Sequence, residues 1–230
     1  IVSEPDLSNA KEAVAYARAV HQLVTYLSVS DGNMSQGSLR CDANVSVRPA
    51  GDTQLGTRTE TKNVNSFKFL ERAIDYEINR QIDLIESGGV VTQETRLYDP
   101  DKDETRPMRN KETATDYRYF PEPDLLPVEI DNAFIQKVRD QMPELPEQKR
   151  ARYISQLGLT AEDARLLTSD LSLASYFEKV NEITKDPAQT ANWVKGELLA
   201  RLNRENISPN DAPIEPRQLG DLILRVNDET

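Results

Sequence analysis

The residues best suited to chemistry lie at alternate positions of one short segment, residues 38–48. Apolar and polar side chains alternate there, which predicts a β-strand with one buried face. Its polar face carries Ser38, Arg40, Asp42, Asn44, Ser46 and Arg48. Successive members lie roughly 7 Å apart along a strand. Carboxylate and amide groups between arginines suit Mg²⁺ and a phosphate group. The alternative is an ordinary solvated strand face.

A second segment with the same period follows at residues 56–64. Its polar face carries Arg58, Glu60 and Lys62. If the two segments pair as a hairpin with their polar faces aligned, Asp42 and Glu60 form a carboxylate pair surrounded by basic side chains. Carboxylates hold Mg²⁺ through oxygen, and cations balance the charge of a transferring phosphoryl group. A cross-strand ladder of salt bridges without further function fits the pattern equally well.

The residues between the second strand and the next helix add polar groups. Asn65 or Ser66 suits the N-cap, and Asn63 lies two residues before Asn65. The unpaired N–H groups and dipole of a helix N-terminus favour an anion. Capping and anion binding therefore both remain open for these side chains.

An aromatic, charged and proline-rich segment lies at residues 116–125. We expect residues 116–130 to be extended rather than helical. Arg118 and the neighbouring tyrosines suit a pocket lining or a nucleic-acid contact. A packed crossover that covers a sheet edge is the alternative.

Several function classes are disfavoured by what the sequence lacks. His21 is the only histidine, and the sequence has no dinucleotide-binding glycine motif or Walker loop, so a Ser-His-Asp hydrolase or an NAD enzyme is not expected. A single cysteine, Cys41, excludes an internal disulfide and favours a reducing, cytoplasmic compartment. No run of 18 apolar residues predicts a transmembrane helix.

The charge balance restricts the mode of binding to nucleic acid. The 230 residues include 28 Lys and Arg against 39 Asp and Glu, a net charge of −11. This balance argues against binding polyanions through bulk electrostatics alone. A local basic track, or Mg²⁺ between carboxylates and phosphate, remains compatible with it.

The elements that position these residues predict an α+β fold. Residues 1–130 are expected to form a partial antiparallel sheet packed by helices at 10–28 and 66–87, with a hairpin within residues 90–109. The apolar stripe of the second helix is predicted to end at Ile82 and Ile85. Residues 131–230 are predicted to form an all-helical domain. Its helices are expected at residues 131–142, 147–157, 161–169, 171–184, 187–204 and 216–227.

These segments also carry a resemblance. The chain resembles, over essentially its whole length, the B subunit of the glutamyl-/aspartyl-tRNA amidotransferases. The resemblance is carried by Asp31-Gly32-Asn33-Met34, Gly37-Ser38-Leu39-Arg40-Cys41-Asp42-Ala43-Asn44-Val45-Ser46-Val47-Arg48, Gly56-Thr57-Arg58-Thr59-Glu60, Lys62-Asn63, Asn65-Ser66-Phe67 and Asp116-Tyr117-Arg118-Tyr119-Phe120-Pro121. It implies that residues 1–130 belong to a catalytic cradle domain and residues 131–230 to a helical domain.

The resemblance implies an ATP- and Mg²⁺-dependent carbon–nitrogen ligase that uses glutamine as its nitrogen donor. Such a subunit phosphorylates the side-chain carboxylate of misacylated Glu-tRNA(Gln) or Asp-tRNA(Asn). Ammonia from a glutaminase (amidase) subunit then displaces the phosphate, giving Gln-tRNA or Asn-tRNA. The implied partners are this amidase subunit, a small accessory subunit and the tRNA.

The resemblance also assigns roles to the polar residues. Asp42, Glu60 and Glu4 would hold Mg²⁺, while the catalytic set is completed by Arg40, Asn44, Arg58 and Lys62. The substrate or phosphate would be bound by Ser46, Asn63, Asn65, Ser66 and Arg118. Thr61 departs from the family, which more often has an aliphatic residue there.

Three functions remain to be separated. The resemblance implies that this chain lacks an N-terminal part with further metal ligands and a C-terminal tail domain, so we expect it to be inactive alone. The leading hypothesis is a catalytic ligase subunit. The competitors are a non-catalytic scaffold that docks tRNA and the amidase subunit, and a Mg²⁺-dependent nucleotidyl or phosphohydrolase domain.

Overall fold

The computed structural model describes residues 1–108 and 123–228, which form two compact units. The first comprises Ile1–Val24 with Ser30–Gln141, and the second Thr25–Val29 with Met142–Thr230. A small mixed sheet with helices in the first unit, and helices alone in the second, confirm the predicted α+β class. The compact units do not test the predicted domain boundary between residues 130 and 131.

The sheet in the described part of the first unit has four strands in the order β1-β2-β3-β4. Their bounds are β1 Cys41–Val45, β2 Thr59–Val64, β3 Thr95–Asp99 and β4 Glu104–Pro107. The predicted antiparallel pairings of β1 with β2 and of β3 with β4 are confirmed. The prediction of an antiparallel sheet is wrong for β2 and β3, which run parallel. The chain returns through a helix between them, and such a crossover allows parallel pairing.

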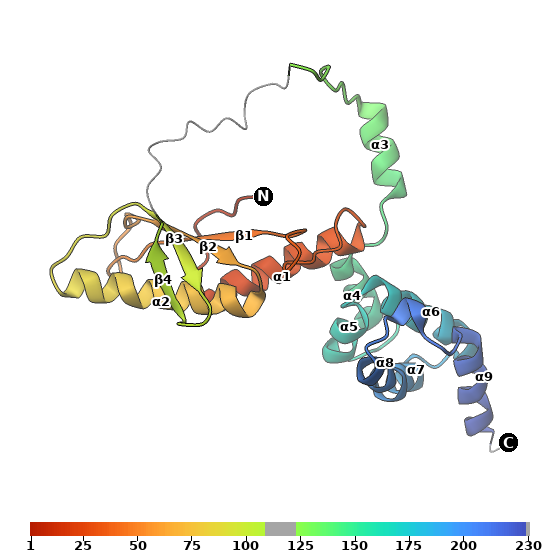
Figure 1. The fold of residues 1–230 in the computed structure, drawn as a ribbon. Coiled ribbons are helices and arrows are strands. Elements are labelled where there is room, and N and C mark those ends of the chain that lie inside the picture. Colours follow the sequence, from red (N-terminus) through yellow and green to blue (C-terminus); the bar gives the residue numbers. More distant parts are fainter. Residues whose placement is uncertain (109–122, 229–230) are drawn as a thin grey trace. The chain divides into compact units, whose positions relative to one another are not determined.

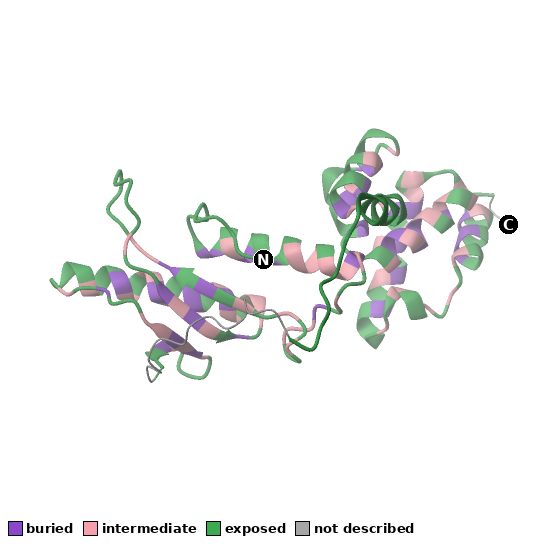
Figure 2. Ribbon diagram, turned by 90° about the horizontal axis from the view of Figure 1, so that it is seen from above, coloured by how far each residue is buried: buried purple, intermediate pink, exposed green. Residues whose placement is uncertain are grey.

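That helix, α2 (Phe67–Glu86), packs along one face of the sheet (Figure 1). Its Leu70, Ala73 and Ile74 join the core. With them in this core are Ala10, Val14 and Ala17 from α1 (Ala10–Tyr26) and Ala43, Val45, Val64 and Tyr98 from the strands. In Figure 2 buried segments alternate with exposed ones along α2.

The predicted apolar stripe of α2 is wrong in its last two turns. Ile82 and Ile85 are 38% and 47% exposed, whereas Glu77 and Gln81 are fully buried. The polar pair lies where the sheet presents threonine hydroxyls and an arginine, so it gains hydrogen bonds that an isoleucine could not make. The helix therefore turns a polar pair inward, in place of the predicted isoleucines.

Gly56 lies where the chain leaving β1 passes the chain entering β2. A Cβ atom on this residue would lie 2.1 Å from the carbonyl oxygen of Val47, which is far inside contact distance. We expect Gly56→Ala to lower the free energy of unfolding by about 1–3 kcal/mol, as overpacking does. Urea unfolding measures this. Gly196→Ala is the control, because a Cβ atom there meets nothing within 4 Å. Equal stability of Gly56→Ala and wild type would show that the backbone moves aside freely.

Thr61 is fully buried, and its hydroxyl has no hydrogen-bond partner. We expect Thr61→Val to raise the free energy of unfolding by about 1 kcal/mol, because it removes an unsatisfied polar atom at nearly constant shape. Thr59→Val is the matched control on the same strand. The Thr59 hydroxyl is bonded to Glu77 and Gln81, so its loss should destabilise the protein. A Thr61→Val variant less stable than wild type in urea would contradict this interpretation.

The second unit is all-helical in its described residues, as predicted. The helices are α4 Pro146–Ser155, α5 Ala161–Leu167, α6 Leu171–Thr184, α7 Pro187–Trp193, α8 Leu199–Glu205 and α9 Pro216–Asn227. The helix predicted at 187–204 is divided by a π-helical turn, Val194–Leu198. The first of the six predicted helices, at residues 131–142, is confirmed as α3 (Asn132–Gln141), and it belongs to the first unit. Among the described residues, no helix is both long and apolar enough to cross a membrane.

Candidate functional site

The polar faces of β1 and β2 lie on the same side of the sheet, as the sequence predicts. Asn44 stands opposite Glu60 across the two strands. Lys62 donates hydrogen bonds from Nζ to Oδ2 of Asp42 at 2.8 Å and to Oε1 of Glu60 at 3.1 Å. The hydroxyl of Thr95, on β3, donates to Oε2 of Glu60 at 3.1 Å. The predicted carboxylate pair therefore exists, with Lys62 bridging its two members.

The Lys62 bridge is only partly shielded from water, since its three side chains are between 35% and 48% exposed. Partial burial lowers the pKa of Lys62, but the hydrogen bonds to Asp42 and Glu60 outweigh that effect and leave the pKa raised. Lys62 is therefore a stable cation at neutral pH. Half-exposed ion pairs of this kind contribute little to stability. Contacts with a metal ion or a phosphate group can therefore replace them at little cost in free energy.

Strand β2 contains a β-bulge at Asn63, directly after Lys62. The register shifts between Cys41 and Ala43, and Asn63 adopts a left-handed conformation with φ 68°. Regular alternation after the buried Thr61 would turn Val64 outward, but the extra residue reverses the faces, so Val64 is buried. The Asn63 amide donates to the backbone oxygen of Tyr98 at 3.0 Å. Asn63 is thus occupied by a structural contact that the sequence pattern did not predict.

The remaining predicted residues differ in their surroundings. Arg40 lies against Gly37, where an added Cβ atom would meet its guanidinium at 3.3 Å. Ser66 is the N-cap of α2, and its hydroxyl accepts a hydrogen bond from the Phe69 N–H at 3.1 Å, so the capping alternative is confirmed for this side chain. The structure leaves Arg40, Asn44, Arg58 and Asn65 exposed and Ser46 half-buried. Arg118 lies outside the described residues.

A metal site at this face would depend on Asp42 and Glu60. Among the described residues, no three His, Cys, Asp or Glu side chains are grouped to hold a metal ion, so Glu4 does not join the pair. Two carboxylates still fit Mg²⁺, which keeps several waters and uses one or two carboxylates together with substrate phosphates. The donor chemistry therefore suits Mg²⁺ that arrives with a nucleotide.

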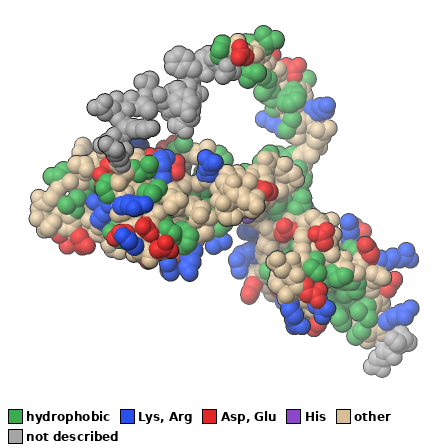
Figure 3. Space-filling model, viewed as in Figure 1, with side chains coloured by type: hydrophobic (Ala, Val, Ile, Leu, Met, Phe, Trp, Pro, Cys, Tyr) green, Lys and Arg blue, Asp and Glu red, His purple; other side chains and the backbone are tan. Residues whose placement is uncertain are grey.

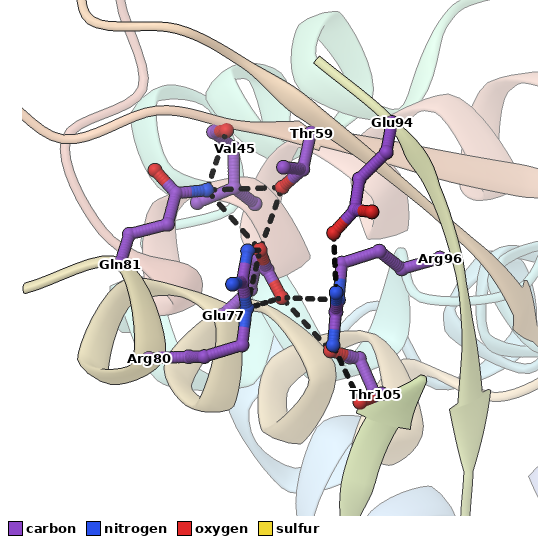
Figure 4. A network of polar contacts seen from close by, with 8 residues as sticks. All are labelled: Val45, Thr59, Glu77, Arg80, Gln81, Glu94, Arg96 and Thr105. Carbon is purple, nitrogen blue, oxygen red and sulfur yellow. Dashed lines mark hydrogen bonds and ion pairs between the residues drawn. The ribbon is translucent and has the colours of Figure 1, made fainter. Parts of the chain in front are cut away.

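Sequence reasoning missed the polar network on the buried side of the same strands (Figure 4). Glu77 accepts hydrogen bonds from Thr59 at 2.7 Å and Thr105 at 2.9 Å, and it pairs with Arg80 and with Arg96. Burial raises the pKa of Glu77, but hydrogen bonds from Arg80, Thr59, Thr105 and Gln81 outweigh it, so the pKa is lowered. The sequence contains one signal for this network. Glu77 lies three residues after the apolar Ile74, so helical spacing places its carboxylate on the same face of the helix as Ile74.

Two family models match the chain. The model described as the GatB/GatE catalytic domain matches residues 1–136, and the model described as the GatB domain matches residues 175–230. The first model covers more than half of the chain and includes the whole β1–β2 polar face. The chain therefore belongs to the GatB/GatE family.

Individual relatives agree with this assignment. Each is the B subunit of an aspartyl/glutamyl-tRNA(Asn/Gln) amidotransferase. Over all 230 residues the chain is 60% identical to the proteins of Hahella chejuensis and Pseudomonas paraeruginosa, and 59% identical to that of Azotobacter vinelandii. The chain covers 48% of each of these relatives, which is about half their length.

Proposed function

We propose that this chain is part of the amidotransferase component that activates the aminoacyl group, and that its β1–β2 polar face is where ATP phosphorylates an aminoacyl side chain. The γ-phosphoryl group passes to a carboxylate oxygen of Glu on tRNA(Gln) or Asp on tRNA(Asn), leaving ADP and an acyl phosphate. Ammonia attacks the acyl carbon and phosphate leaves, which gives the amide. The nitrogen comes from glutamine through an amidase subunit.

In this proposal the two carboxylates and the cations have separate tasks. Asp42 and Glu60 would hold Mg²⁺, and the bound ion would supply charge screening for the phosphates. Lys62, which now bridges both carboxylates, would release them to the metal ion and would meet a phosphate oxygen with its ammonium group. Arg40 and Arg58 balance the remaining negative charge on the phosphoryl group. They form no covalent bond, since catalysis of phosphoryl transfer depends on positioning and electrostatic stabilisation.

The other polar residues contribute to substrate positioning. Asn44, Ser46 and Asn65 lie on or beside the face and would orient the aminoacyl end of the tRNA, together with Arg118. Ser66 and Asn63 act indirectly, because the first caps α2 and the second forms the bulge beside Lys62. The proposed assembly contains the amidase subunit and a small accessory subunit in the cytoplasm.

The Lys62-bridged carboxylate pair carries the proposal, because it lies within the match to a catalytic domain and has the donors that Mg²⁺ and phosphate need. On the face of the helical unit that Figure 3 shows, acidic and basic side chains lie beside each other.

The test uses the full-length protein assembled with its amidase partner. We expect ADP formation to rise at least tenfold when misacylated Glu-tRNA(Gln) or Asp-tRNA(Asn) is added, and not to rise with uncharged tRNA or correctly charged Gln-tRNA. If this chain is only a scaffold and another chain does the chemistry, the Glu60→Gln assembly would form ADP with misacylated tRNA as fast as wild type. A phosphohydrolase would turn over ATP equally well without tRNA, and either result would refute the proposal.

A further inference from the structure

We propose that the buried network around Glu77 is a positioning device for Glu60, the candidate carboxylate on the opposite face of the sheet. This inference rests on the proposed function, since it assigns the network to the same site. Glu77 is the centre of the network, and it belongs to α2 rather than to either strand of the polar face. It contacts neither carboxylate of the Lys62 cluster and acts only through other residues.

The first route from Glu77 to Glu60 passes through β2. The Thr59 hydroxyl donates to Oε1 of Glu77 and accepts a hydrogen bond from Nε2 of Gln81 at 2.9 Å. The same Gln81 nitrogen donates to the backbone oxygen of Val45, which pairs with Thr59 across the strands. The residue next to Glu60 is therefore held in place from α2 and from β1 together.

The second route passes through β3. Arg96 pairs with Glu77 at 3.3 Å and with the side chain of Glu94. The backbone oxygen of Glu94 accepts the N–H of Glu60 at 3.0 Å, and the next residue, Thr95, donates its hydroxyl to the Glu60 carboxylate. Both the backbone and the side chain of Glu60 are thus fixed by a segment that Arg96 ties to Glu77.

The geometry explains why a charged network is buried here. Figure 4 shows side chains from β2, β3, β4 and α2 converging on the Glu77 carboxylate. An apolar contact would hold these elements together without fixing the direction of any one side chain. The hydrogen bonds that Thr59 and Thr105 donate to Glu77 are directional, and a carboxylate that holds a metal ion must be placed within about 0.5 Å.

The test separates the two routes with variants that leave the polar face itself intact. Thr59→Val removes the hydroxyl at constant shape, Thr59→Ser keeps it, and Glu94→Gln weakens the pairing with Arg96 at a part-exposed site. In the full assembly we expect Thr59→Val and Glu94→Gln to lower kcat at least tenfold, with the KM for Glu-tRNA(Gln) within twofold of wild type. Thr59→Ser should restore kcat to within about threefold.

Two further readouts distinguish positioning from general stability. Mn²⁺ binding, followed by electron paramagnetic resonance as a probe for the Mg²⁺ site, should weaken at least fivefold in Thr59→Val and recover in Thr59→Ser. In a Glu60→Gln background, Thr59→Val should reduce kcat by less than twofold, because a residue that acts through Glu60 loses its effect when Glu60 is changed.

Each outcome has a defined meaning. If Glu60→Gln lowers activity but folded Thr59→Val and Glu94→Gln keep wild-type kcat and Mn²⁺ affinity, this inference is overturned and the proposed function stands. Additive losses in the double variant overturn it as well, since they indicate a purely structural network. If Glu60→Gln itself changes neither activity nor Mn²⁺ binding, both the proposed function and this inference fail.

Discussion

Replacing either carboxylate of the Lys62 cluster is expected to lower amidotransferase activity by a hundredfold or more. The variants are Glu60→Gln and Asp42→Asn in full-length protein assembled with its amidase partner. Each substitution removes the charge of a proposed Mg²⁺ ligand but keeps the shape of the side chain. A hundredfold loss corresponds to about 3 kcal/mol of transition-state stabilisation. ATP- and Glu-tRNA-dependent formation of Gln-tRNA measures it.

Folding should survive both substitutions, because these side chains are partly exposed and contribute little to the core. Circular dichroism and urea unfolding provide that check. Glu86→Gln, at the exposed end of α2, removes a carboxylate away from the cluster and should leave activity unchanged. Near wild-type activity of both cluster variants would show that Asp42 and Glu60 are structural, as the scaffold alternative requires.

The helical half of the chain could be predicted from the sequence because local signals determine it. Pro146, Pro187 and Pro216 each stand in the first turn of a helix, where the missing N–H costs nothing. Apolar periodicity between such boundaries needs no information from distant residues. The strand alternation of residues 38–48 is local in the same way, but β1 is shorter than predicted (Cys41–Val45). Of the predicted polar face, the strands therefore contain Asp42, Asn44, Glu60 and Lys62.

The missed features all depend on residues distant in sequence. The parallel pairing of β2 with β3 follows from the path of α2, which no period-two pattern encodes. The bulge at Asn63 reverses the faces of β2 by one residue, and a regular alternation cannot anticipate it. Glu77 resembles any exposed helical carboxylate until the strands supply Thr59 and Thr105, which lie 18 and 28 residues away.

Glu77→Ala is expected to lower the free energy of unfolding of the full-length protein by about 3–5 kcal/mol, because it leaves the buried Arg96 and the half-buried Arg80 without their shared carboxylate. Urea unfolding measures the loss, and Glu86→Ala on the exposed end of the same helix is the matched control. A loss below about 1 kcal/mol would mean that water or another carboxylate replaces Glu77, and that the network is not what holds the strands together.

The pH dependence of the free energy of unfolding provides a second test of the contribution of Glu77 to stability. The folded pKa of Glu77 is lowered from its ordinary value of 4.5, so the unfolded chain binds the proton more tightly than the folded one. The contribution of Glu77 to stability is therefore complete above about pH 4.5 and is lost as the pH falls through the lower folded pKa. We expect wild type to lose more stability than Glu77→Gln between pH 6 and pH 3.5, because the amide has no proton to bind. Equal losses in urea titrations at the two pH values would show that Glu77 is not the carboxylate whose protonation weakens the fold, and that its hydrogen bonds to Thr59 and Thr105 act without charge.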